Sequence, residues 1–155
     1  MMNDTIKERN KPVVAFVEDC ACSAAYGIAS ACDMIIANHK MANVGSIGSL
    51  STILDYRKML EKDGITEITV YASQSKDKND WYREALDGNT EKLQKISDKF
   101  AEDFIQTIET NRNGKLKTGR AEWGTGKEYF ADQALEVGLI DGIDSLENVL
   151  NYFNT

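Results

Sequence analysis

The chain has 155 residues, of which 42% are hydrophobic and 28% charged, as in an ordinary globular domain. Its formal net charge of −7 argues against a nucleic-acid or anionic-membrane surface, because such surfaces neutralise phosphates with clustered Lys and Arg. No apolar run reaches the ~18 residues that span a bilayer. The polar start of the chain also lacks the apolar core of a secretory signal, so a cytoplasmic location is predicted.

The first third of the chain alternates short apolar runs with small residues. The run "KPVVAFVED" (residues 11–19) is typical of a strand that is covered on both faces. Residues 23–33, rich in alanine, predict a buried helix packed closely on a sheet. Residues 34–38 predict a second strand, and the glycine-containing residues 42–53 predict a turn followed by extended chain.

The rest of the chain continues to alternate. A helix is predicted over residues 53–65, stopped by Gly64, and a strand over residues 65–73. After Thr90, a predicted helix cap, apolar residues recur at helical spacing and predict a stripe of packing surface: Leu93, Ile96, Phe100, Phe104, Ile105 and Ile108. Residues 130–153 predict a short helix, a glycine stop, a strand and a last amphipathic helix. This alternation favours a mostly parallel α/β layer fold.

The cysteines and the single histidine offer little chemistry. Three cysteines form no even disulfide framework and supply too few ligands for a closed zinc site, so we predict reduced cysteines and no metal. His39 lies at a predicted turn, and nothing in the sequence suggests the third group that a catalytic imidazole needs. We interpret it as an exposed turn residue.

Ser23 lies where a predicted strand gives way to a helix. The unpaired N–H groups of a helix start can hold an oxyanion, which would suit a nucleophile, but serine is also a common helix cap. A lysine can replace histidine as the base when burial favours the neutral amine. Lys76 and Lys78 follow a predicted strand, and their spacing alone indicates only exposed loop charges.

Two stretches together carry a family resemblance. "KPVVAFVEDCACSAAYGIASACDMIIAN", followed by "VGSIGSL", resembles the serine/lysine peptidases of the signal peptide peptidase A (protease IV) family, which includes the phage prohead proteases. The nucleophilic serine of that family matches Ser23, and a tyrosine and an aspartate match Tyr26 and Asp33. Cys20 and Cys22 stand where the family has small residues. The likeness extends from about residue 11 to about residue 153.

The resemblance implies a complete set of site residues. Lys76, in "SKD", matches the general base, with Lys78 as the second choice, and Ser46 matches a serine that orients the lysine. The backbone N–H of Ala24 would serve the oxyanion hole, and no metal or organic cofactor is needed. The substrate is expected to pair along the turn segment at Gly45, Ile47 and Gly48.

The resemblance also implies the fold. It is an α/β fold of the ClpP/crotonase type, with a mostly parallel sheet flanked by helices. Residues 1–10 would be a polar tail and residues 11–155 a single, partial peptidase-like domain. Family members carry further strands and helices before this region, including the turn that gives a second oxyanion N–H. We therefore expect the N-terminal part of the domain to be missing, which leaves membrane association open.

The predicted function is hydrolysis of peptide bonds in signal peptides or in phage scaffold or capsid proteins, in the second case from a prophage. The partners would be a peptide or protein substrate, no nucleic acid, and further copies of the chain in a homo-oligomer. The alternative is an inactive or fragmentary member that serves in assembly; alanines in place of the two glycines that usually follow the serine favour it. Acyl-CoA chemistry in a crotonase-like enzyme would not need the serine and turn motifs.

Overall fold

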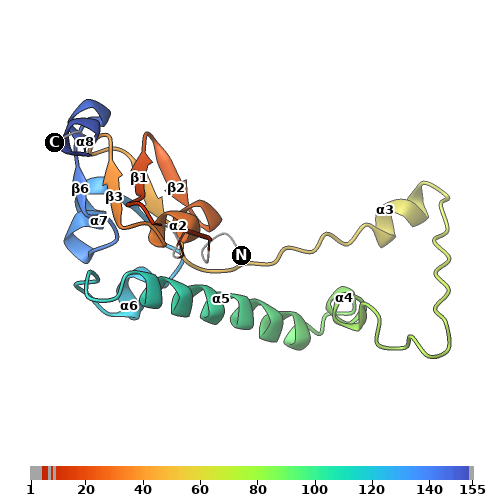
Figure 1. Ribbon diagram of the computed structural model, residues 1–155. Helices are drawn as coiled ribbons and strands as arrows, with labels where there is room; N and C mark the ends of the chain where they lie inside the picture. The colour runs from red at the N-terminus through yellow and green to blue at the C-terminus, as the bar shows by residue number, and fades with distance from the viewer. Residues whose placement is uncertain (1–4, 7, 9, 154–155) are drawn as a thin grey trace. The chain divides into compact units, whose positions relative to one another are not determined.

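The structure, a computed structural model, describes residues 5–6, 8 and 10–153. Most of the predicted polar tail, residues 1–4, 7 and 9, lies outside the described residues. The chain divides into two compact units (Figure 1). The first comprises residues 1–49 and 100–155, and the second comprises residues 50–99.

The first unit contains two small sheets of three strands each. In one sheet, the parallel strands β1 (Val14–Val17), β3 (Met34–Ala37) and β6 (Gly142–Ile143) lie in the order β1-β3-β6. Their apolar, β-branched residues suit strands that are covered on both faces. The two strands predicted from residues 11–19 and 34–38 thus pair side by side, as Figure 1 shows.

The second sheet has the order β2-β4-β5. β2 (Cys20–Cys22) pairs with β4 (Asn43–Gly45) in parallel, and β4 pairs with β5 (Glu128–Phe130) in the antiparallel sense. Neither β2 nor β5 is separable in the sequence pattern, because three-residue strands are too short to show periodicity. The chain therefore passes through a separate strand, β2, before it reaches Ser23.

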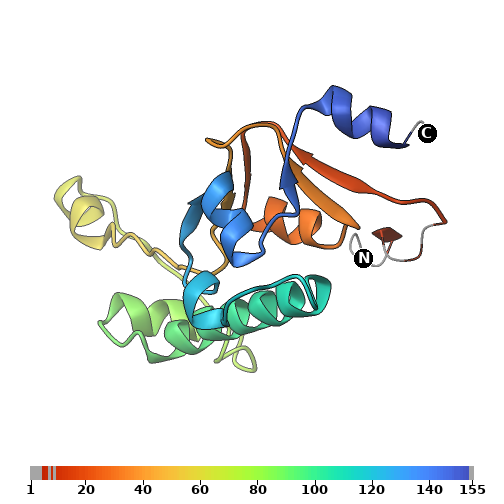
Figure 2. The same ribbon diagram turned by 90° about the vertical axis from the view of Figure 1, so that its left-hand side faces the viewer.

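Helices cover the sheets of the first unit (Figure 2). The small-residue stretch forms α2 (Ala24–Ser30), and the predicted C-terminal helices form α7 (Ala131–Val137), which ends at Gly138, and α8 (Leu146–Phe153). A short helix, α6 (Arg120–Trp123), precedes β5. The long helix α5 (Glu91–Asn111) begins in the second unit and ends in the first.

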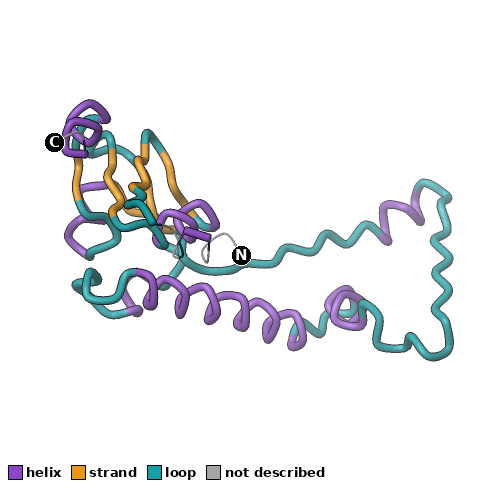
Figure 3. Tube along the Cα trace, viewed as in Figure 1, coloured by secondary structure: helices purple, strands orange, loops and turns teal. Residues whose placement is uncertain are grey.

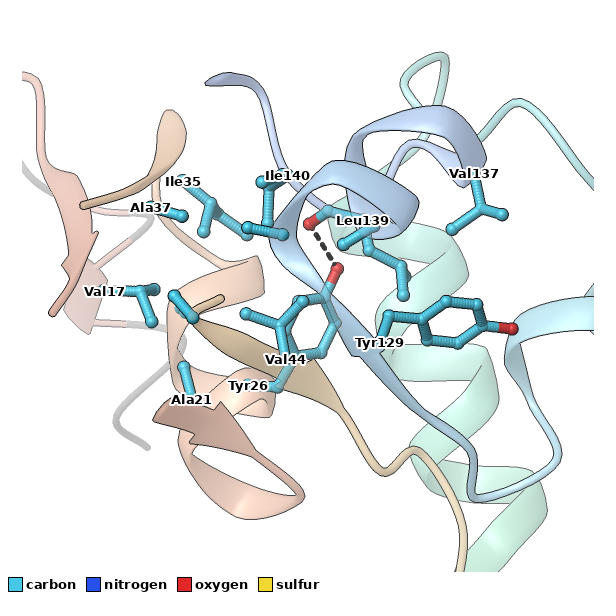
Figure 4. Close-up of a cluster of buried hydrophobic side chains, with 14 of the residues drawn as sticks. Val17, Ala21, Tyr26, Ile35, Ala37, Val44, Tyr129, Val137, Leu139 and Ile140 are labelled. Carbon is cyan, nitrogen blue, oxygen red and sulfur yellow. Dashed lines mark hydrogen bonds between the residues drawn. The ribbon is translucent and has the colours of Figure 1, made fainter. Parts of the chain in front are cut away.

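The core of the first unit collects apolar side chains from both sheets and from α2, α5 and α7 (Figure 4). Of the predicted stripe on α5, Ile108 is fully buried, and Phe104 and Ile105 pack against the core. Phe100, by contrast, is 66% exposed. The stripe is therefore packing surface only along its C-terminal part.

The second unit contains α3 (Arg57–Lys62) and α4 (Asp80–Leu86). The helix predicted before Gly64 is confirmed in shorter form, but the strand predicted over residues 65–73 does not form. Figure 3 shows this segment as loop, and Ile68 and Val70 are 83% and 87% exposed. A strand exists only when its backbone groups find a neighbour, and none of the described residues supplies one here.

Candidate active site

Ser23 lies at a sharp junction between β2 and α2. Its backbone N–H donates to the Gly45 carbonyl at 2.8 Å, which extends the β2–β4 ladder by one residue. Its φ and ψ are 54° and −125°, a conformation that residues other than glycine adopt only at a cost of about 1–3 kcal/mol. A serine on a strained strand-to-helix turn is the arrangement that exposes the hydroxyl of many serine hydrolases.

The hydroxyl of Ser23 is not used for helix capping. Ser23 occupies the N-cap position of α2, yet its side chain makes no capping hydrogen bond. The residue is exposed, and the first N–H groups of a helix have no acceptor within the helix, so the Ala24 N–H stands beside an open hydroxyl. The capping role, which position alone favours, does not explain this serine.

Ser46 lies next to Ser23 on the neighbouring strand. Cys22 and Gly45 are the last register partners of β2 and β4, and Ser23 and Ser46 are the residues that directly follow them. Ser46 also has a positive φ, 52°, and its backbone N–H donates to the Lys127 carbonyl at 2.9 Å. The two predicted site serines are thus brought together by backbone pairing.

The segment after β4 is held from one side only. Ser46 N–H and the Ile47 carbonyl bond to the chain just before β5, at Lys127 and Gly126. On the other side, β2 has already turned into α2. Among the described residues, the N–H groups of Ile47 and Gly48 have no hydrogen-bond partner. Ile47 is fully buried whereas Gly48 is partly exposed, so the Gly48 N–H is the donor that an extended peptide could use.

Helix α2 is fixed by contacts from distant parts of the chain. The Tyr26 hydroxyl donates to the Leu139 carbonyl at 2.7 Å, as the dashed line in Figure 4 marks. Burial raises the pKa of Tyr26, so it stays a neutral donor. A side chain at Gly27 would meet the Phe104 ring at 3.1 Å, so glycine allows α5 to pack closely on α2. These contacts set the direction in which Ser23 enters the helix.

The segment that accepts the Tyr26 bond is itself anchored by a buried ion pair. Arg112, fully buried, donates to both carboxylate oxygens of Asp141 at 2.8 and 3.2 Å and to the Gly138 carbonyl at 2.8 Å. Burial alone would raise the pKa of Asp141, but hydrogen bonds from Arg112 and from the Ile35 N–H outweigh it and hold that pKa below its usual value. The pair is therefore charged, and it ties α5 to the β3–β6 sheet.

The sequence suggested no partner for His39, but the structure places a carboxylate beside it. Its Nε2 lies 3.2 Å from the Asp19 carboxylate, and both side chains are exposed. Asp19 precedes β2 whereas Ser23 follows it, so their Cα atoms are about 13 Å apart at ~3.3 Å per residue. A base must reach the hydroxyl within about 3 Å. The His39–Asp19 pair thus lies at the opposite end of β2 from Ser23.

The cysteines beside Ser23 are poor nucleophiles. Burial, and then the neighbouring Cys20 thiol, raise the pKa of Cys22 to about 12, whereas a reactive cysteine needs a lowered pKa. All three cysteines are free thiols. Among the described residues, no group of three or more His, Cys, Asp and Glu side chains could hold a metal ion.

Lys76 and Lys78 belong to the second unit. Both are exposed, and the Arg83 guanidinium donates to both of their carbonyls, at 2.8 Å in the case of Lys76. Arg83 also stacks 4.6 Å over the Tyr71 ring, so it organises the lysine-bearing loop. No motif in the sequence had indicated this arginine. The pairing of either lysine with Ser23 stays a prediction.

A family model matches almost the whole chain. It is the model of peptidase family S49, and it covers residues 5–155. The chain belongs to peptidase family S49. The peptidase resemblance carried by the serine and turn motifs is thereby confirmed.

Curated relatives of this S49 chain are longer than it is. "Putative protease MJ0651" of Methanocaldococcus jannaschii is 31% identical over 142 residues, which cover 92% of this chain and 45% of that protein. "Putative signal peptide peptidase SppA" of Enterococcus faecium is 27% identical, with 94% and 42% covered. "Na(+)/H(+) antiporter NhaA" of Brucella abortus is 31% identical, with 96% and 20% covered. The chain spans less than half the length of these three relatives.

Solved structures confirm the predicted ClpP/crotonase-type fold. A membrane-bound stomatin-specific protease matches with a TM-score of 0.54 and 14% identity, over 97% of this chain and 59% of its own. A "Putative enoyl-CoA hydratase/isomerase family protein" from Hyphomonas neptunium matches with a TM-score of 0.52 and 18% identity, over 98% and 41%. Both likenesses concern the fold alone. Within the described residues, no helix is long and apolar enough to cross a membrane.

Proposed function

We propose that this S49 chain carries the nucleophile of a Ser/Lys peptidase, with Ser23 attacking the scissile carbonyl. The observation that supports this most is the strained backbone of Ser23 combined with a hydroxyl that caps nothing. Strain at a non-glycine residue persists only where the surrounding structure enforces it, and it is concentrated at functional sites. A simple helix cap would need neither feature.

The base in this proposal is Lys76. Its neutral amine takes the proton of the Ser23 hydroxyl and later gives it to the leaving amine, while Ser46 orients the lysine. Lys78 is the second choice, because it follows Lys76 by two residues in the same exposed loop. His39 is no rival, since it sits at the far end of β2.

The substrate would lie as an extended peptide along the segment that follows β4. The N–H group of Gly48 would pair with it in the manner of an added strand, close to the Gly45 carbonyl that holds Ser23. The Ala24 N–H would stabilise the oxyanion. A relative that is named as a signal peptide peptidase favours signal peptides over phage scaffold or capsid proteins as the substrate class.

Peptide cleavage by single-site variants tests this assignment. With a fluorogenic peptide that has a small residue before the scissile bond, Ser23→Ala and Lys76→Ala should each remove detectable cleavage. Lys78→Ala and His39→Ala are the matched controls and should retain most of it. Circular dichroism must show that all four variants stay folded. An active Lys76→Ala protein refutes the dyad, and loss of cleavage in His39→Ala as well would favour a histidine base.

The second candidate is an inactive family member that serves in assembly. The exposure of both Lys76 and Lys78 favours it, because a lysine base needs a desolvated site to be neutral. The same assay separates the candidates. If the chain is an inactive module, the wild type would cleave no peptide. A serine-directed fluorophosphonate would then label Ser23 no faster than it labels Ser51.

A further inference from the structure

The loop that carries Lys76 is built from short turns. Residues 73–79 form turns and irregular chain rather than a helix or a strand. Within them, the Ser75 N–H donates to the Ala72 carbonyl at 2.8 Å, and the Lys78 N–H donates to the Ser75 carbonyl at 3.1 Å. Exposed loops of this kind are more mobile than helices and strands, whereas a general base must lie within about 3 Å of the proton that it removes. A base in this loop therefore needs support from outside it.

Arg83, on α4, supplies that support. The residue is half-buried, and its guanidinium donates to the Lys76 carbonyl at 2.8 Å and to the Lys78 carbonyl. The Lys76 carbonyl belongs to the planar peptide group that follows its Cα, so holding it restricts the rotation about ψ of Lys76. That rotation sets how the side chain leaves the loop relative to its neighbours. Because the guanidinium is planar and charged, its donors hold two acceptors in a fixed geometry.

Arg83 is itself held at several points. Its guanidinium lies 4.6 Å over the ring of Tyr71, a cation–π contact with a residue just before the loop. Its helix is tied to the first turn of α5 by Lys92, which donates to Asp80 at 2.6 Å and to Glu84 at 2.7 Å. The arginine thus joins the start of the loop to its middle and to the helix at its end.

A second arginine of the same unit provides a comparison. Arg57, at the start of α3, donates to the carboxylates of Asp55 and Asp87, each at 2.8 Å. It also donates to the Leu86 carbonyl at the end of α4. The hydrogen bonds of Arg83, in contrast, go to the main chain of both lysines that the sequence indicates as candidate bases. This choice of acceptors distinguishes Arg83 from an arginine that only connects two helices.

We propose that Arg83 is a positioning residue for the peptidase reaction, a role that rests on the function proposed above. By fixing the carbonyls of Lys76 and Lys78, it limits the directions in which the base can point when it takes the proton of Ser23. The role is the same whichever lysine is the base, because the arginine holds both. Since this role involves no contact with the substrate, Arg83 acts on the rate of the chemical step rather than on substrate binding.

Separate measurement of kcat and KM tests this role. Arg83→Met should lower kcat for peptide cleavage by about 10- to 100-fold, because a displacement of about 1 Å can cost about 100-fold in rate. KM should stay within about twofold of the wild-type value. Arg83→Lys should recover part of kcat, since an ammonium replaces the charge but not the planar pair of donors. Arg57→Met, the matched control, removes an equal charge and should retain the wild-type kcat. Circular dichroism must show that all three variants stay folded.

Hydrogen exchange separates this role from the peptidase function itself. The Lys78 N–H should exchange about 10-fold faster in Arg83→Met than in the wild type, because its turn loses the support of the guanidinium. In Arg57→Met the exchange rate should be unchanged. A wild type that cleaves no peptide refutes the proposed function, whereas the exchange rate still tests the hold of Arg83 on the loop. Unchanged exchange or an unchanged kcat in Arg83→Met, or an equal loss of kcat in Arg57→Met, overturns the positioning role.

Discussion

Replacing Ser23 by glycine and by alanine separates its two structural features. Glycine removes both the hydroxyl and the Cβ, whereas alanine removes the hydroxyl alone. The Cβ is what makes φ 54° and ψ −125° unfavourable, because glycine has no steric conflict at positive φ. A stabilising Ser23→Gly change with a neutral Ser23→Ala change would therefore identify strain rather than capping.

The expected free energies follow from these two terms. Relief of the backbone strain should contribute about 1–3 kcal/mol, and the greater freedom of glycine in the unfolded chain should cost about 0.5–1 kcal/mol. Ser23→Gly should thus raise the free energy of unfolding by about 1 kcal/mol. Ser23→Ala should change it by less than about 0.5 kcal/mol, as for a surface substitution, because the hydroxyl makes no capping bond.

Urea unfolding followed by circular dichroism measures both changes, provided that the m-values of the three proteins agree. If Ser23 were a helix cap, neither variant would be more stable than the wild type: alanine would destabilise by about 0.5–2 kcal/mol and glycine by a few tenths. That result would refute the strained-nucleophile reasoning. Peptide cleavage should be absent in both variants. The Ser23→Gly protein would therefore be more stable than the wild type and yet inactive.

Three other predictions concern the support of the site and its base. Tyr26→Phe should lower the free energy of unfolding by about 1–3 kcal/mol in urea, since the buried Leu139 carbonyl loses its 2.7 Å donor. Because the pKa of Asp141 is lowered in the folded state, its contribution to stability should be complete above about pH 5 and decline as the pH falls below about 4; Asp141→Asn should remove this dependence. The kcat/KM for peptide cleavage should rise with pH if Lys76 must be neutral, and a flat profile would contradict a lysine base.

The sequence predicted the elements that are long or strongly apolar. Continuous apolar runs predicted the strands around Val14 and Ile35. Apolar residues at helical spacing predicted the helix that begins after Thr90. β2 could not be separated from β1, since the apolar run continues to Val17 and only Glu18 and Asp19 mark the bend between the two strands. β-propensity alone predicted a strand over residues 65–73, where the structure offers no neighbouring strand.

Local motifs predicted some residues of the candidate site, whereas residues that only tertiary contacts bring together were missed. Ser23 and Ser46 could be selected from local motifs, and their adjacency then follows from the β2–β4 register. Asp19 beside His39 could not be foreseen, because the two residues are 20 positions apart in the sequence and no local pattern indicates which turns meet. Arg112 belongs to no motif in the sequence, and only tertiary packing shows it buried against Asp141.

The position of Ser23 therefore depends on residues more than a hundred positions away. Pairing with Gly45 fixes its backbone N–H, but the direction of its side chain depends on α2, which is held through Tyr26 at Leu139. Leu139 lies in the segment that Arg112 fixes at Gly138. A loosened ion pair would free this segment, then the Tyr26 contact, and α2 could rotate until Ser23 relaxes to an ordinary φ. We therefore expect a weakened charge pair to reduce the peptide cleavage proposed for Ser23 before it unfolds the chain.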